Sequence, residues 1–269
     1  MLGERHMSLS PSDHEVPRRD LAAEAETLRS LHRRGAPLML ANVWDPPSAR
    51  VAETVGLAAV ATASAALAPV NGYEDHGGLP PDVAFGALGR IARSVSLPVT
   101  ADLEDGYGLP AEDLVDRLLR AGASGLNLED SDHGGGGALV DPGGQAEYIR
   151  AVKAAGRARG VDVVLNARVD VFLQGGAVAD GLERARRYIE AGADCVYPIF
   201  LADLGAIGEF AALGPTNVLW RPGAPRLADL ASAGAARISV GPVLFRLMLQ
   251  RLETAMAAFR NLDDDGVTG

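Results

Sequence analysis

The chain has 269 residues, of which 48% are apolar and 22% charged, and its formal net charge is −10. This composition is typical of a globular protein and excludes a chain that is disordered throughout. The acidic balance, with no block of Lys and Arg, argues against nucleic acid as a partner.

In chain order, residues 1–19 are expected to form a disordered tail. They hold no apolar core of a signal peptide, and no run in the chain reaches the ~18 apolar residues that a membrane span needs. We therefore expect a cytoplasmic protein that does not bind membranes. Residues 261–269 are expected to form a second short tail, which leaves 20–260 for one domain. The single cysteine, Cys195, cannot form an internal disulfide and is expected to be buried.

Short apolar runs alternate with amphipathic segments along the domain. The apolar runs predict strands at 37–43, 57–64, 97–104, 125–130, 161–170, 195–200, 217–220 and 236–241. The amphipathic segments predict helices at 46–55, 81–94, 111–121, 145–158, 179–190, 202–212, 226–233 and 242–260, with an additional helix at about 20–33. Near-continuous apolar strands are typical of a parallel sheet whose outer face is covered.

A repeated glycine supports this alternation. ETVGLAAV, LRAGASGLNL, IEAGADCVYP and ASAGAARISV each place a glycine where a helix ends before a strand. Glycine there adopts the left-handed conformation that ends a helix in a tight turn. Four copies of this device indicate a repeated βα unit, so we predict an α/β fold, a (β/α)₈ TIM-type barrel. A doubly wound open sheet is the alternative, which the lack of a GxGxxG fingerprint after any strand disfavours.

Polar residues gather where the predicted strands end, and catalytic residues of such barrels lie there. Asp102 and Glu104 are two residues apart and point to the same side of one strand, and Glu129 ends the next strand. Three carboxylates at a barrel mouth would repel one another unless a cation or protons neutralised them. Oxygen ligands suit Mg²⁺ or Mn²⁺ better than zinc. The three acids are therefore the predicted metal ligands; solvated loop acids or helix caps are the alternative.

Other polar side chains at the strand ends are candidates for substrate binding. Arg168 lies within an apolar strand and needs an anionic partner, either a substrate carboxylate or a buried acid. Arg221 has the same two interpretations, and Asn166 shares the strand of Arg168. His76 and His133 lie in glycine-rich loops, either as acid/base groups or as solvent-exposed side chains.

The strings WDPPSARVAETVG, ADLEDGYG, NLED and NARVD, in this order and spacing, resemble the isocitrate lyase / phosphoenolpyruvate mutase superfamily over roughly residues 36–245. The resemblance implies a (β/α)₈ barrel that exchanges its last helix with a neighbouring subunit, in a homo-oligomer that is a dimer or a tetramer. It also implies Mg²⁺, with Mn²⁺ as an alternative, and a small-molecule carboxylate substrate built on a 2-oxo or 2-hydroxy acid.

Carried over by position, the resemblance assigns the three acids to the metal site and implies that Arg168 holds the substrate carboxylate. It also places Asp45 and Ser64 in the substrate pocket, beside Trp44 at the end of the first strand. The predicted catalytic set is Arg168, Asp45, Ser64 and His133. The predicted substrate-binding set is Trp44, Asp45, Ser64, Arg168, Asn166 and Arg221.

Two departures from the family pattern bear on the reaction. Glu104 stands where the lyases have a second aspartate, and the loop DSDHGGGGALVDPGG at 130–144 lacks their Lys/Cys/Gly/His signature. Without that thiol, ordinary isocitrate or methylisocitrate lyase activity is not expected. We expect a lyase or decarboxylase that cleaves a C–C bond through a metal-stabilised, pyruvate-like enolate. The alternatives are a phosphonate enzyme, of the phosphoenolpyruvate mutase or phosphonopyruvate hydrolase type, and an inactive barrel that binds Mg²⁺ and an oxo acid.

Overall fold

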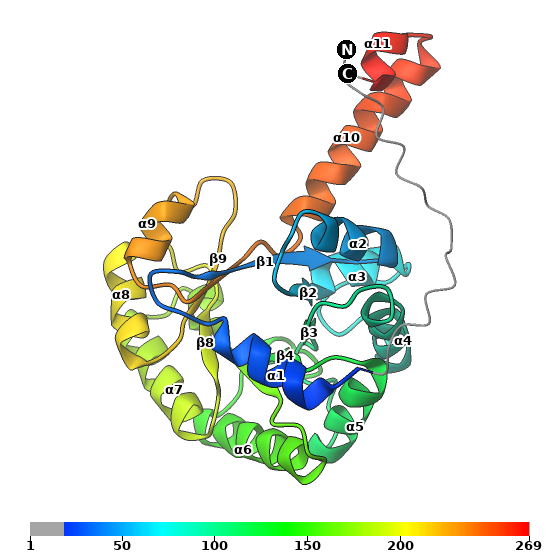
Figure 1. Cartoon of the computed structure of the whole chain (residues 1–269). Helices are drawn as coiled ribbons and strands as arrows, with labels where there is room; N and C mark the ends of the chain where they lie inside the picture. The colour runs from blue at the N-terminus through cyan, green and yellow to red at the C-terminus, as the bar shows by residue number, and fades with distance from the viewer. Residues whose placement is uncertain (1–18, 269) are drawn as a thin grey trace.

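The computed structural model describes residues 19–268, and within them eight parallel strands form one sheet (Figure 1). The strands neighbour one another in the order β8–β7–β4–β3–β2–β1–β10–β9, and a parallel bridge from Val196 to Thr216 joins the two ends. The predicted (β/α)₈ barrel is therefore confirmed. The strands are β1 (Leu38–Val43), β2 (Val60–Thr62), β3 (Val99–Asp102), β4 (Gly125–Leu128), β7 (Val164–Val169), β8 (Cys195–Pro198), β9 (Asn217–Leu219) and β10 (Arg237–Ser239).

Helices surround the sheet, and each predicted helix overlaps one of them (Figure 1). They are α1 (Leu21–Ser30), α2 (Pro46–Thr54), α3 (Ser64–Val70), α4 (Pro81–Ala92), α5 (Ala111–Ala121), α6 (Pro142–Ala158), α7 (Val178–Glu190), α8 (Leu204–Leu213), α9 (Leu227–Ser232), α10 (Val243–Arg260) and α11 (Asp264–Thr268). A hairpin of β5 (Ser131–Asp132) and β6 (Ala138–Leu139) follows β4, and a 3₁₀ turn (Asp170–Gln174) follows β7. The sequence pattern does not predict α3, α11, the hairpin or the 3₁₀ turn.

The helix α5 shows why these segments fold as they do. Its buried side chains recur with the 3.6-residue period of an amphipathic helix, at Leu114, Val115, Leu118 and Ala121. The helix ends at Gly122, whose φ of 88° is left-handed. The glycines of the other three repeats also have positive φ: Gly56, Gly192 and Gly234. The predicted helix-ending glycine is therefore present in all four repeats.

The N-terminal ends of the strands are closed by α1, which lies across that end of the barrel (Figure 1). Leu28 of α1 is fully buried and lies against Gly125 at the start of β4. Arg29 donates to the backbone carbonyl of Asp162 at 2.6 Å and to the carboxylate of Asp194 at 2.7 Å. Because this end is filled, a ligand has access to the barrel at the opposite end, where the strands finish.

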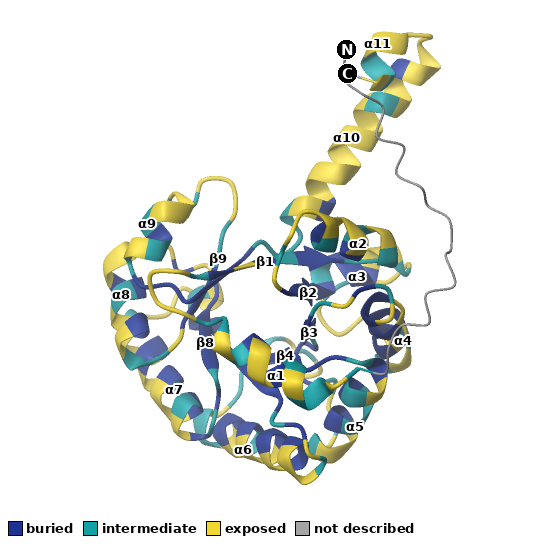
Figure 2. Ribbon diagram, in the orientation of Figure 1, coloured by how far each residue is buried: buried dark blue, intermediate teal, exposed yellow. Residues whose placement is uncertain are grey.

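The last long helix, α10, extends away from the barrel and carries α11 at its far end (Figure 1). Figure 2 shows that most of α10 is exposed, in contrast to the inward faces of the other helices, which cover the core. Seven large apolar side chains of α10 are exposed: Leu244, Leu247, Met248, Leu249, Leu252, Met256 and Phe259. This surface lacks a partner within residues 19–268.

The described residues reach into both predicted tails. Arg19 donates to the backbone carbonyls of Ala92 and Leu97, both at 2.6 Å, so it belongs to the fold. Residues 1–18 of the predicted N-terminal tail lie outside the described residues. The predicted C-terminal tail contains α11, which packs against α10. In the described part of the chain, no helix is long and apolar enough to cross a membrane.

Candidate active site

A cavity of about 260 Å³ opens at the C-terminal ends of the strands. Its floor is polar and is formed by Asn42, Ser64, Asp102, Asn127 and Arg168. Each of these side chains lies at or near the end of a strand, because residues there point over the open end of the barrel. The predicted site residues that line this cavity are Ser64, Asp102, Arg168 and Arg221.

Asp102 ends β3 and lies beside Ser64, the first residue of α3. The backbone N–H and the hydroxyl of Ser64 donate to its Oδ2 at 3.0 and 3.2 Å. The Oδ1 atom is buried and has no hydrogen-bond partner within the described chain. Burial raises the pKa of Asp102, against the opposing effects of Arg168 and the Ser64 hydrogen bonds. Asp102 thus keeps one oxygen available for a cation.

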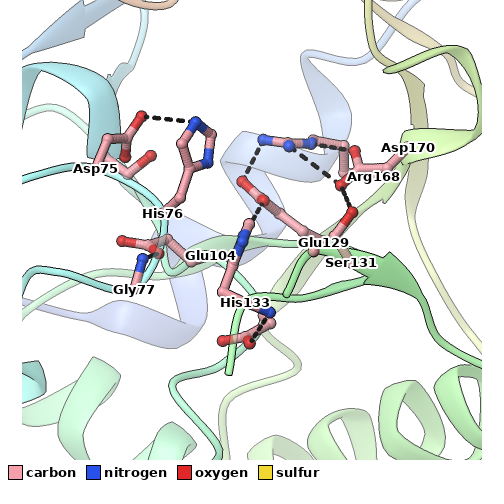
Figure 3. Close-up of polar contacts among 12 residues, drawn as sticks. Asp75, His76, Gly77, Glu104, Glu129, Ser131, His133, Arg168 and Asp170 are labelled. Carbon is pink, nitrogen blue, oxygen red and sulfur yellow. Dashed lines mark hydrogen bonds and ion pairs between the residues drawn. The ribbon is translucent and has the colours of Figure 1, made fainter. Parts of the chain in front are cut away.

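Glu104 lies two residues beyond Asp102 and has a left-handed backbone, with φ of 51°. Few non-glycine residues adopt this conformation, and those that do cluster at functional sites. Its Oε2 accepts from the backbone N–H of Gly77 at 2.5 Å, and its Oε1 is buried without a partner in the described chain (Figure 3). Burial, together with the nearby charge of Asp102, raises the pKa of Glu104 to about 7.

Glu129 follows β4 and is held from two sides (Figure 3). Its Oε1 contacts the guanidinium of Arg168, and its Oε2 accepts from Nε2 of His133 at 2.7 Å. Burial raises the pKa of Glu129 to about 7, although Arg168 and His133 both oppose the shift. The same hydrogen bond raises the pKa of His133 to about 9, so His133 is protonated and donates at neutral pH.

The other side of the Arg168 guanidinium contacts Asp170. Nε and Nη2 of Arg168 lie 2.5 and 3.1 Å from the two carboxylate oxygens of Asp170, which also accepts from the Ser131 hydroxyl at 2.6 Å. Arg168 therefore has buried acidic partners, which was one of the two interpretations that the sequence allowed. It also lines the cavity, so the acids fix its position for a ligand.

The three predicted metal ligands differ in what they can offer. Among residues 19–268, no three His, Cys, Asp or Glu side chains form a ready metal-binding cluster. Asp102 and Glu104 each have a buried oxygen without a partner, which is costly unless a cation or a proton neutralises it. Both oxygens of Glu129 are engaged by Arg168 and His133. Asp102 and Glu104 thus fit a hard, oxygen-liganded cation such as Mg²⁺, while Glu129 stays a predicted ligand.

Three predicted substrate-binding residues make other contacts and are not among the described residues that line the cavity. Asp45 caps α2, since its carboxylate accepts from the Ser48 N–H at 2.7 Å in a capping box. The Trp44 ring packs against Phe245, with ring centroids 5.2 Å apart. Asn166 is fully buried and donates to a floor residue, Asn127, at 2.8 Å. These are structural contacts, and a substrate-binding role for the three residues stays a prediction.

The two loop histidines have different surroundings (Figure 3). His76 lines the cavity, its side chain is 68% exposed, and its Nε2 is 3.7 Å from a carboxylate oxygen of Asp75. The His133 side chain is 8% exposed and is bonded to Glu129. His76 is therefore the histidine that a ligand would meet, and His133 positions Glu129.

The structure adds cavity residues that the predicted site omits. Asn42, Tyr197 and Ser239 line the cavity from β1, β8 and β10. Asn42 also accepts from the backbone N–H groups of Val240 and Gly241 at 3.1 and 2.8 Å, which joins β1 to the turn after β10. Each of these three residues is a polar side chain within or at the end of an apolar strand, and this pattern could have identified them in the sequence.

This arrangement defines a class of protein. Buried, partly unpaired carboxylates and a fixed arginine lie at the open end of the barrel. They form a site of the type found in enzymes, which suits a small anionic ligand and a cation.

Comparisons with known proteins identify the family. The model of the phosphoenolpyruvate phosphomutase family matches residues 28–260. An uncharacterised protein of Mycobacterium tuberculosis is 33% identical over 221 residues, which cover 81% of this chain and 82% of that protein. The 2-methylisocitrate lyase of Aeropyrum pernix is 31% identical over 215 residues, which cover 77% of this chain and 66% of the lyase.

A solved structure agrees with these matches. A Burkholderia cenocepacia protein named as a phosphonomutase is 39% identical, with a TM-score of 0.81 over 90% of this chain and 99% of that chain. The chain belongs to the isocitrate lyase / phosphoenolpyruvate mutase superfamily of enzymes, as the sequence motifs predict.

Proposed function

We propose that the protein is a Mg²⁺-dependent lyase or decarboxylase that cleaves a C–C bond of a small 2-oxo or 2-hydroxy carboxylate. The observation that carries the proposal is the pair of unpartnered, buried carboxylate oxygens on Asp102 and Glu104, of which Asp102 lines the cavity together with Arg168. A cation at the two acids and the guanidinium would together offer two positive centres to a substrate carboxylate and its neighbouring oxygen.

Each polar residue has a role in this proposal. When bound, Mg²⁺ supplies Lewis-acid stabilisation to the oxygen that gains charge as the C–C bond breaks. Arg168 binds the substrate carboxylate and orients the bond. Ser64 holds Asp102 so that its free oxygen keeps one position. His76, on the cavity lining, donates the proton that the product carbon takes up, and His133 keeps Glu129 in place.

The segment 130–144 favours a decarboxylase among these reactions. It contains no cysteine, and loss of CO₂ needs no protein acid to begin bond cleavage. Ser131–Asp132 and Ala138–Leu139 pair as a hairpin, and Leu139 packs against the core. The four glycines at 134–137 form the tip between these strands, where glycine gives the backbone freedom to move over a ligand.

A phosphonate enzyme is the second candidate. The relative named as a phosphonomutase, at 39% identity, favours it. Phosphonopyruvate has the same 2-oxo carboxylate, so Arg168 and the two acids would bind it in the same way. The loop 131–144 has no Lys or Arg to stabilise a transferring phosphoryl group, which favours C–C chemistry.

A substrate screen tests the proposal. The protein is incubated with Mg²⁺ and oxaloacetate, 2-methylisocitrate, isocitrate, alkyl-substituted malates or phosphonopyruvate, and release of pyruvate or glyoxylate is measured. We expect turnover of at least one C–C substrate, lost with EDTA and restored by Mg²⁺ or Mn²⁺. Turnover of phosphonopyruvate alone would establish the second candidate. Mg²⁺-dependent oxalate binding without any turnover would show an inactive binding barrel.

We also propose that α10 is exchanged between subunits of a homo-oligomer. Leu247, Met256 and Phe259 of α10 are 51%, 61% and 74% exposed, and burial of such apolar area stabilises a complex by roughly 25 cal/mol per Å². A second copy of the chain offers the same helix in return, which makes a self-complementary interface.

Light scattering tests this proposal. At micromolar concentration we expect a mass that is a multiple of 27.9 kDa, for a dimer or a tetramer. The double variant Leu252→Glu/Met256→Glu should be monomeric, because charges on this face cannot be buried without partners. The control Gln250→Glu, on an exposed polar position of the same helix, should keep the wild-type mass. A monomeric wild type would contradict the exchange.

A further inference from the structure

Directly below the cavity floor, the interior of the barrel holds polar side chains. Three of them are fully or almost fully buried, and each lies two residues before a residue that lines the cavity: Arg237 before Ser239, Asn166 before Arg168 and Thr100 before Asp102. Side chains two residues apart on a strand point to the same side, so all three point into the barrel. Branched apolar residues usually fill this layer, which makes a guanidinium there unusual.

The buried charge of Arg237 is poorly compensated. The residue is 1% exposed, and within residues 19–268 its Nε and Nη1 atoms have no hydrogen-bond partner. Nor does any acid of that range form an ion pair with it. Burial lowers the pKa of the guanidinium, against the attraction of groups that include Asp102. An apolar residue in place of such a charge is often neutral or stabilising, so Arg237 is not explained by the stability of the fold.

Arg237 reaches across the barrel to the cavity floor. Its strand, β10, is four places from β4 in the ring of eight strands, so the two strands face each other. Nη2 of Arg237 donates to Oδ1 of Asn127 on β4 at 3.2 Å, and Asn166 donates to the same oxygen at 2.8 Å. A guanidinium has donors and no acceptor, so Asn127 must turn its oxygen toward Arg237. Asn166 cannot impose this orientation alone, because its own carboxamide offers an acceptor as well as donors.

The nitrogen end of the Asn127 carboxamide is therefore available to a ligand. Among the described residues Nδ2 has no hydrogen-bond partner, it is not one of their buried unpartnered atoms, and the side chain lines the cavity. The strand β4 lies between β3 and β7, which carry Asp102 and Arg168. A ligand held by Arg168 and by a cation at Asp102 thus lies over the N–H groups of Asn127.

We infer that Asn127 donates a hydrogen bond from Nδ2 to the bound oxo acid, and that Arg237 is the positioning residue that fixes this donor. The inference rests on the proposed function, in which Arg168 and a cation at Asp102 hold the ligand. A donor whose orientation is set in advance stabilises the charge that an oxygen gains as a bond breaks. Without Arg237, the carboxamide can turn its oxygen toward the anion and repel it.

Two measurements on the full-length protein separate positioning from support of the fold. Isothermal titration in Mg²⁺ gives the Kd of oxalate, and thermal unfolding in EDTA gives the Tm. Arg237→Met should keep the wild-type Tm or raise it, because it removes a buried charge without an acidic partner. The same variant should bind oxalate about 10-fold more weakly, as expected when a hydrogen bond to a charged group is lost.

A double variant shows whether Arg237 acts through Asn127. Asn127→Leu has a similar shape but no donor, and it should weaken oxalate binding by about the same factor as Arg237→Met. Combined with Asn127→Leu, Arg237→Met should weaken binding by less than about 2-fold more, because the two residues act as one unit. Thr100→Val is the matched control. It also removes a buried, unpartnered polar group from this layer, and it should bind oxalate like wild type.

The outcomes distinguish this inference from the function on which it rests. If Arg237→Met binds oxalate as tightly as wild type, loses stability in EDTA or fails to fold, the arginine serves the fold and the inference is overturned. Independent losses that multiply in the double variant would also overturn it, since Arg237 would then act without Asn127. In these cases wild type still binds oxalate with Mg²⁺, and the proposed function stands. If wild type does not bind oxalate with Mg²⁺, the proposed function and the inference both fail.

Discussion

Replacing Asp102 with alanine is expected to abolish metal-dependent turnover and to remove the stabilisation that Mg²⁺ and oxalate give the protein. A ligand at 100 times its Kd stabilises the native state by about 2.7 kcal/mol. For a domain of this size each kcal/mol shifts Tm by about 2–4 °C, so wild type should gain roughly 5–10 °C. Asp102→Ala should gain little, because it lacks the acid with a free buried oxygen on the cavity floor.

Without metal, the same variant should be as stable as wild type or slightly more stable. Burial raises the pKa of Asp102, which means that its charged form is disfavoured in the folded protein. Because its folded-state pKa is raised, the Asp102 carboxyl contributes to the stability of the folded protein at low pH. This contribution is lost as the pH rises through the folded pKa. Removal of the carboxylate therefore relieves the cost at neutral pH, against the loss of two hydrogen bonds from Ser64.

Thermal unfolding of wild type and variant, with EDTA and with millimolar Mg²⁺ plus oxalate, measures both effects. Asp82→Ala is the control, because the Asp82 side chain is 88% exposed and its ion pair with Arg117 contributes little. If wild type shows no metal-dependent shift, the acids do not form a metal site under these conditions. If Asp102→Ala shifts as much as wild type, the ligand lies elsewhere.

The fold could be predicted from the sequence because the patterns that indicate its strands and helices are local. Each strand is a short apolar run and each long helix has a clear period, so the order of elements follows from the sequence. The segment Ser64–Val70 was missed since SAALAPV is short, rich in alanine and contains Pro69, which gives it no helical signature. This helix affects the site. Ser64 starts a helix instead of ending a strand, and its backbone N–H therefore donates to Asp102.

Only part of the site could be predicted from the sequence. Asp102 and Arg168 could be placed because the ends of barrel strands share one face. The partners of a side chain depend on tertiary structure, so the contacts of Glu129 with Arg168 and His133 have no sequence signature. The capping role of Asp45 did have one, since Pro46 begins the helix and Ser48 stands three residues after Asp45.

Replacing Arg168 with glutamine is expected to destabilise the metal-free protein by about 3–5 kcal/mol, the usual cost of breaking a buried ion pair from one side. The variant removes the guanidinium from the carboxylates of Glu129 and Asp170, which are 1% and 0% exposed, although Glu129 keeps its hydrogen bond from His133. Glutamine cannot restore the charge or the paired contact with Asp170. The proposed hold on the substrate carboxylate is also lost, so turnover should fall below detection.

The cost should depend on pH, and its direction tests the cause. The pKa of Glu129 is raised to about 7 even though Arg168 opposes the rise, so removal of Arg168 raises it further. At pH 5 the Glu129 carboxyl is then protonated and its burial costs little, whereas at pH 8 the folded protein must hold it charged or keep its proton at a free-energy cost. Urea unfolding in EDTA should therefore show a larger loss of unfolding free energy at pH 8 than at pH 5.

Arg187→Gln is the control. It removes only an exposed pair with Glu183 and should cost less than about 1 kcal/mol at both pH values. A loss for Arg168→Gln as small as this control, or one that is larger at pH 5, would contradict the view that Arg168 neutralises the buried acids of the site.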